Sequence, residues 1–108
     1  MMAWICLLLA GICEIGWPLG FKLAQTSGYR ALFILFAAVS MGVSGWLLYF
    51  AQKSIPIGTA YAIWTGIGAA GAFIVGVMLF GDALNSGRLL GVGMIVGGVI
   101  VLKLMSTT

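Results

Sequence analysis

The protein has 108 residues, of which 63% are hydrophobic and 6% are charged, and its net charge is +3. Ordinary soluble domains carry about 25% charged residues, so this chain has too few charges to cover a water-facing surface and its surface must face lipid. The five basic residues stand singly near the ends of apolar runs and form no basic stripe, which argues against nucleic-acid binding.

Four apolar runs are long enough to cross a membrane as helices, which takes about 20 residues each. They cover about residues 2–22, 29–51, 57–80 and 88–105. Because the connections are short, neighbouring helices are expected to run antiparallel in a small up-down bundle. We therefore predict an all-α integral membrane protein, with a single four-helix transmembrane domain over residues 1–108. The first run lacks the basic segment and cleavage site of a signal peptide, so it is expected to be retained.

Glu14 lies near the middle of the first run, with about a dozen residues before it. A carboxylate at this depth costs a few kcal/mol, which makes it a candidate functional group. In general, loss of water favours the protonated form of a carboxyl group, whereas a nearby cation favours the ionised form. Such a group can hold either a proton or a cation, the minimal chemistry of a proton-coupled cation exporter. The alternative is a structural role, in which a protonated Glu14 forms a hydrogen bond between helices.

Other residues of the first run are placed to shape this site. Gly11 and Trp17 stand three residues to either side of Glu14, on the same helix face. Gly11 is expected to open space beside the carboxylate, and Trp17 offers a ring face and an N–H donor. Pro18 lacks the N–H that would bond the carbonyl of residue 14, so the helix is expected to bend there.

Cys6 and Cys13 lie a heptad apart in the first run. This spacing is too long for a disulfide between them. Since the chain has no histidine, the usual zinc sites have too few ligands. We expect no metal and no cofactor.

The second and third runs add polar and aromatic residues. Ser44 is the polar residue nearest the middle of the second run, and its hydroxyl is a candidate to orient the Glu14 carboxylate. Tyr61, Trp64 and Gly68 of the third run follow i, i+3, i+7 spacing and share one helix face. Aromatic faces attract cations by about 0.5–2 kcal/mol each. Lipid-interface aromatic residues are the alternative.

Glycines cluster in the third run just after Trp64. Gly66, Gly68 and Gly71 interrupt the pattern of larger side chains. Beside a binding site, glycines suit a hinge that differs between two conformations, as alternating access requires. The alternative is that these glycines serve only to let helices pack closely.

The fourth run carries glycines on two adjacent stripes, and we predict that they form a dimer contact: Gly91, Gly93, Gly97 and Gly98. Small residues at GxxxG spacing allow helices to approach closely in lipid. The basic residues divide three to two between the two sides of the membrane. This near balance permits insertion in both orientations and hence an antiparallel homodimer. A single orientation, set by small effects or by a partner chain, stays open.

Two stretches resemble the small multidrug resistance family: residues 9–14 together with Trp17, and residues 56–68, which read PIGTAYAIWTGIG. The similarity extends over essentially the whole chain. Trp17, Gly58–Thr59, Trp64–Gly66 and Leu102–Lys103 resemble the guanidinium-exporter subtype in particular.

This resemblance implies an antiparallel homodimer in the bacterial inner membrane that exchanges protons for guanidinium. It also implies that the last helix is the main dimer contact. The residues implied at the site for small cations and protons are Glu14, Gly11, Trp17, Ser44, Tyr61 and Trp64.

The sequence departs from the expected pattern at two places. Pro18 stands where a small non-proline residue is expected. Glycines flank Ser44 in the second run, and we hypothesise a lateral opening to lipid at Met41, Gly42 and Gly45. Such an opening would admit substituted guanidinium and quaternary ammonium cations with alkyl tails.

Three alternatives remain for the function. An exporter of bulky aromatic drugs is disfavoured by Thr59, Thr65 and Lys103. A subunit that functions only with a paralogue is disfavoured by the intact Glu14. A passive cation channel would differ from an exchanger in its lack of dependence on a proton gradient.

Overall fold

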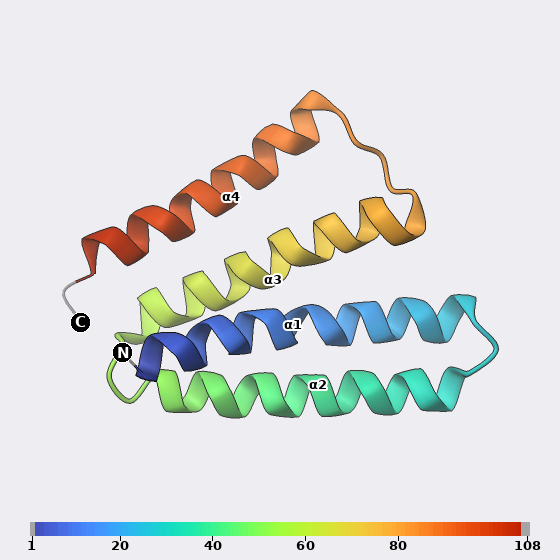
Figure 1. Ribbon diagram of the computed structural model, residues 1–108, viewed down its shortest axis with the longest axis horizontal. Coiled ribbons are helices and arrows are strands. Elements are labelled where there is room, and N and C mark those ends of the chain that lie inside the picture. Colours follow the sequence, from blue (N-terminus) through green and yellow to red (C-terminus); the bar gives the residue numbers. More distant parts are fainter. Residues whose placement is uncertain (1, 107–108) are drawn as a thin grey trace.

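The computed structural model describes residues 2–106, which form four helices joined by short connections (Figure 1). The helices are α1 (Met2–Thr26), α2 (Arg30–Ala51), α3 (Ile57–Phe80) and α4 (Ser86–Met105). Their lengths of 20 to 25 residues correspond to about 30–38 Å, enough to cross a hydrocarbon layer of about 30 Å. Each is also apolar enough to span a membrane. The predicted all-α fold with four spans is confirmed.

Two helices are longer than predicted. α1 continues past Lys22 to Thr26, whose hydroxyl donates a hydrogen bond to the Lys22 carbonyl at 3.0 Å. α4 begins at Ser86 because Asn85 caps it: the Asn85 side chain accepts a hydrogen bond from the backbone N–H of Arg88 at 2.9 Å. Both extensions come from polar side chains that satisfy backbone groups at helix ends.

Both ends of α3 follow from backbone chemistry. Pro56 stands immediately before α3, where a missing N–H costs no helical hydrogen bond. Gly81 ends α3 with a φ of 69°, a left-handed conformation that glycine adopts without steric cost. These breaks make neighbouring helices antiparallel.

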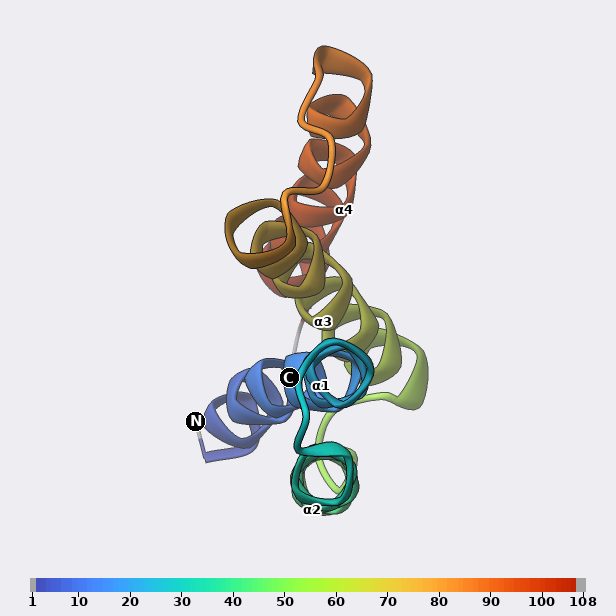
Figure 2. The ribbon, with the colours of Figure 1, turned by 90° about the vertical axis from the view of Figure 1, so that its right-hand side faces the viewer.

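The helices lie side by side in the order α4, α3, α1, α2 (Figures 1 and 2). α1 is central and packs against both α2 and α3, whereas the backbone of α4 lies close to α3 alone. α4 therefore projects away from the other helices (Figure 2), and none of its residues is buried. The up-down order is as predicted, but within one subunit the bundle stays open on the α4 side.

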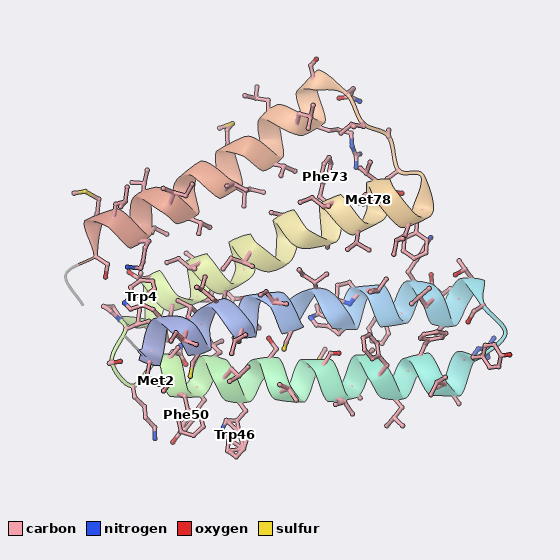
Figure 3. The ribbon with its side chains drawn as sticks, in the orientation of Figure 1. Met2, Trp4, Trp46, Phe50, Phe73 and Met78 are labelled. Carbon is pink, nitrogen blue, oxygen red and sulfur yellow. The ribbon has the colours of Figure 1, made fainter. Side chains whose placement is uncertain are left out.

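A small apolar core joins the N-terminal half of α1 to the region where α2 leads into α3. Its members are Leu7, Ala51, Ile55, Ala60 and Ile63, all at most 2% exposed. Many larger apolar side chains instead point outward, such as Trp46 at 60% and Met78 at 76% exposure (Figure 3). This distribution suits a lipid-facing exterior, which has no need of polar cover.

α1 and α2 approach each other closely along a row of small residues. A Cβ added to Gly16 would lie 2.5 Å from Ser40 Oγ, and one added to Gly20 would lie 3.0 Å from Ala37 Cβ. Gly16 and Gly20 thus form a GxxxG pair, which lets two helices approach closely in lipid. This pair was not predicted from the sequence.

The helices α1 and α3, which carry five of the six predicted binding residues, are continuous. α1 runs through Pro18 and bends: Figure 2 shows its C-terminal turns nearly end-on while its N-terminal turns veer to one side. The bend agrees with the missing N–H that Pro18 cannot offer to the Glu14 carbonyl. α3 runs without interruption through Gly66, Gly68 and Gly71, so a hinge at these glycines stays a prediction.

We expect Gly20→Ala to destabilise the protein. The added methyl group would lie 2.9 Å from the Phe33 carbonyl oxygen, so the backbone must shift at an overpacking cost of about 1–3 kcal/mol. The measurement is the thermal unfolding midpoint of the purified protein in detergent. Gly42→Ala, where an added Cβ has no atom within 4 Å, is the matched control. Equal midpoints for the two variants would contradict the tight contact between α1 and α2.

Candidate functional site

Glu14 lies near the middle of α1, at the contact with α3. It is half-buried, and a Cβ added to Gly68 of α3 would lie 2.5 Å from its Cγ. The missing side chain at Gly68 therefore leaves the room that Glu14 occupies. The protein's other acid, Asp82, lies in the connection between α3 and α4. Within residues 2–106, Glu14 is thus the acidic residue that lies inside a membrane-spanning helix.

Among these described residues, no hydrogen bond or ion pair engages the Glu14 carboxylate. A charged carboxylate without a partner is costly in apolar surroundings. A proton relieves this cost by removing the charge, and a bound cation relieves it by pairing with it. The arrangement therefore suits a group that holds one or the other.

A buried serine connects three helices one turn before Glu14 on α1. Ser44 of α2 is fully buried, and its Oγ donates a hydrogen bond to the Ala10 carbonyl oxygen of α1 at 2.6 Å. The same Oγ accepts a hydrogen bond from Trp64 Nε1 of α3 at 2.8 Å. The Ala10 carbonyl is also the helical acceptor position for the N–H of Glu14. The hydroxyl therefore positions the Trp64 indole, rather than the carboxylate that the sequence analysis assigned to it.

The predicted aromatic residues form two separate groups. Tyr61 and Trp64 of α3 have ring centroids 5.4 Å apart, with their planes tilted by 50°. Tyr61 is exposed and Trp64 is half-buried. Trp17 instead makes an edge-to-face contact with Phe21, one turn further along α1, at 5.7 Å. The structure thus joins Tyr61, Trp64 and Ser44 in one cluster and places Trp17 next to Phe21.

Gly11 serves packing between α1 and α3. It is buried, and a Cβ added to it would lie 2.7 Å from Cβ of Ile67. From the sequence, Gly11 was expected to open space beside Glu14. In the structure the absent side chain lets the two helices approach, and Ile67 takes up that space.

The glycines of α3 face different neighbours. A Cβ added to Gly66 would lie 2.5 Å from Cγ2 of Val99 on α4, whereas Gly68 faces Glu14 on α1. Both are buried. A change in the path of α3 at this point would therefore alter its contacts with α4 and α1 together.

Two further sets of glycines face open space. An added Cβ would meet no atom within 4 Å at Gly42, Gly45, Gly91, Gly93, Gly97 and Gly98. Met41, beside the first set, is 47% exposed. No contact within one subunit explains why these positions are glycine. The lateral opening and the dimer contact stay predictions.

Two groups that contact the site helices were not predicted from the sequence. One is the backbone carbonyl of Ala10, which accepts the Ser44 hydrogen bond. The other is Ser40, one turn before Ser44 on α2, whose hydroxyl faces Gly16 across the contact with α1. Two serines at i, i+4 spacing in an apolar run were the available signal, since they share one helix face.

The remaining side chains that could carry chemistry lie singly. Cys6 and Cys13 of α1 are free thiols. Within residues 2–106, no three His, Cys, Asp or Glu side chains gather where they could hold a metal ion.

The fold and the site define a small helical membrane protein with a carboxylate inside one of its spans. The family described as "Small Multidrug Resistance protein" matches residues 2–95, and the chain belongs to this family. The four spans and the bacterial relatives make it a multi-pass protein of the inner membrane.

The chain is similar to proteins named "Guanidinium exporter". That of Salmonella typhimurium is 48% identical over 104 residues, covering 95% of this chain and 97% of the relative. That of Yersinia pestis is 45% identical over 106 residues, covering 97% and 100%, and that of Citrobacter freundii is 45% identical over 106 residues, covering 95% and 97%. The resemblance to the guanidinium-exporter subtype is confirmed.

Loss of the Ser44 hydroxyl is expected to cost more stability than loss of another hydroxyl on the same helix. Ser44→Ala removes the acceptor of Trp64 Nε1, which costs about 1–3 kcal/mol for an unsatisfied donor. Ser40→Ala is the matched control, because the described residues give the Ser40 side chain no hydrogen bond. Thermal unfolding midpoints in detergent compare the two variants, and equal losses would contradict the role of the Ser44 bridge.

Proposed function

We propose that the protein is a proton-coupled antiporter that exports guanidinium across the bacterial inner membrane. The observation that carries the proposal is Glu14, a carboxylate in the middle of a span that the described residues leave without a partner. The choice of guanidinium is supported by the relatives with that printed name, which are 45–48% identical over nearly the whole chain.

The chemistry of guanidinium fits a carboxylate. The ion is planar and carries N–H donors in a fork that matches both oxygens of one carboxylate, giving parallel charge-assisted hydrogen bonds. A proton on Glu14 removes both the negative charge and an acceptor position. Proton and guanidinium therefore compete for the same atoms, and arrival of one releases the other. This competition couples their movements without a separate gate and without covalent chemistry.

The surrounding residues have separate roles in this proposal. The rings of Tyr61, Trp64 and Trp17 line the path of the cation and attract it through their faces. Ser44 holds the Trp64 indole in place through a 2.8 Å hydrogen bond. Gly11 keeps α1 and α3 in close contact, so the carboxylate meets its substrate in a narrow site.

We further propose that two copies assemble antiparallel, so that both Glu14 carboxylates line one site. The near balance of basic residues, three against two, supports insertion in both orientations. The absence of buried residues along α4 supports a contact with a second copy. Its glycines would allow close approach there: Gly91, Gly93, Gly97 and Gly98.

Transport of guanidinium is expected to require Glu14. The purified protein is reconstituted in liposomes with an acidic interior, so that outward proton flow drives uptake of labelled guanidinium. Glu14→Gln should reduce uptake to background, because an amide can neither bind the proton nor carry the charge. Asp82→Asn is the matched control, since it neutralises the acid outside the spans, and it should retain most of the uptake.

Other outcomes would replace the proposal with a specific alternative. Guanidinium uptake that ignores the proton gradient would indicate a passive channel. Transport of quaternary ammonium cations without guanidinium would indicate a drug exporter. Absence of both, in folded protein, would indicate a subunit that needs a paralogue.

We also propose that α2 admits alkyl tails of substituted guanidinium and quaternary ammonium cations from the side. Met41 is exposed, and an added Cβ at Gly42 or Gly45 would meet no atom within 4 Å. This face of α2 is therefore flat in one subunit, and a tail lying against it would stay in hydrocarbon while the charged head reached Glu14.

A bulky residue on this face is expected to change the substrate range. Gly45→Phe should abolish transport of cations with long alkyl tails and leave guanidinium transport close to that of the unmodified protein. Gly45→Ala is the control, because it adds a methyl group without blocking the surface. Uptake of both substrates is measured in the same liposomes. An equal loss for tailed and untailed cations would overturn the lateral opening.

A further inference from the structure

A cavity distinct from the Glu14 site lies between α4, the start of α1 and α3. Its volume is about 270 Å³ and its walls are apolar. The residues that line it are Trp4, Leu8, Ile63, Val99, Ile100, Lys103 and Leu104. Within a membrane span, the apolar walls of this cavity, called the slot below, suit a hydrocarbon chain.

The ammonium group of Lys103 lies at one end of this slot. Lys103 lies in the last turn of α4 and is exposed, and its Nζ is 4.4 Å from the centre of the Trp4 ring. Figure 3 shows Trp4 at the end of the molecule where α1 begins. Tryptophan is enriched at the depth of lipid headgroups, and lysine side chains extend to the same depth. The ammonium group is therefore placed at headgroup level above an apolar slot.

The slot and one glycine stripe of α4 occupy different sides of the helix. Ile100 is two residues beyond Gly98, which corresponds to about 200° around a helix. A second copy packed on the stripe of Gly91 and Gly98 would consequently leave the wall formed by Ile100 uncovered. Ile100 instead continues the other stripe, seven residues after Gly93. The wall therefore faces lipid in an assembled protein where the second copy packs on Gly91 and Gly98, and is covered where it packs on Gly93 and Gly97.

We propose that this slot binds an anionic phospholipid, with one acyl chain between α1 and α4 and the phosphate paired with Lys103. The charge selects the occupant, since a lysine at the membrane surface attracts anionic headgroups. A zwitterionic lipid with the same chains carries its own cation beside the phosphate, so it gains less binding free energy from Lys103. The bound chain would support α4, whose backbone otherwise lies close to α3 alone. The site is independent of guanidinium binding at Glu14.

The test is lipid binding to the purified, delipidated protein, measured by native mass spectrometry. The probes are phosphatidylglycerol and phosphatidylcholine with identical chains. Phosphatidylglycerol is expected to bind about fivefold more tightly, the gain of about one lysine contact. Lys103→Gln should abolish this preference. Lys53→Gln is the matched control: Lys53 is also a lysine at a helix end, over the rings of Tyr49 and Phe50 at 5.3 and 4.7 Å, and its loss should leave the preference intact.

A second variant tests the slot itself. Ile100→Trp keeps Lys103 but fills the space for the chain, and because Ile100 is 53% exposed the protein should still fold. Binding of both lipids is expected to weaken severalfold. The proposal is overturned if Lys103→Gln keeps the full preference for phosphatidylglycerol. It is also overturned if Ile100→Trp binds lipid normally while converting dimer to monomer, since a second copy would then occupy the slot.

Discussion

A carboxylate that must lie within hydrocarbon without a permanent partner is the constraint on which the rest of this structure depends. A fixed partner for Glu14 would lower its cost but would also compete with a proton or a cation. The structure leaves room for the carboxylate at Gly68 of α3, which has no side chain. The nearest buried hydroxyl, that of Ser44, is committed to Ala10 and Trp64, which leaves the carboxylate available.

The same use of small residues explains how α1 packs closely against α2 and α3. α1 is central, and its glycines bring it into close contact with both neighbours: Gly11 with Ile67 of α3, and Gly20 with α2. α4 lies outside this arrangement, and an added Cβ at its four glycines would meet no atom within 4 Å. In the proposed dimer, a second copy packs on this exposed face of α4.

The spans and the acid within them could be predicted from the sequence because each depends on local chemistry. The family was predicted from the resemblance of residues 9–14, Trp17 and residues 56–68 to its members. Run length and composition determine which segments cross a membrane, and the cost of desolvation singles out the acid within them. The partners of Ser44 could not be predicted, since they depend on which faces of α1, α2 and α3 meet. The contact of Gly11 with Ile67 could not be predicted for the same reason, because sequence spacing gives the helix face of Gly11 but not the residue that lies opposite. The outward position of α4 also required the structure.

The central claim is that a proton and guanidinium compete for Glu14. It is tested most directly by measuring the protons released to solution when guanidinium chloride is added to purified protein in weakly buffered detergent. The pH is chosen so that part of the Glu14 carboxyl groups are protonated. The account predicts proton release that saturates as guanidinium binds, and no release from Glu14→Gln. Guanidinium binding to the unmodified protein without proton release would contradict the account, because the two ions would then occupy different sites.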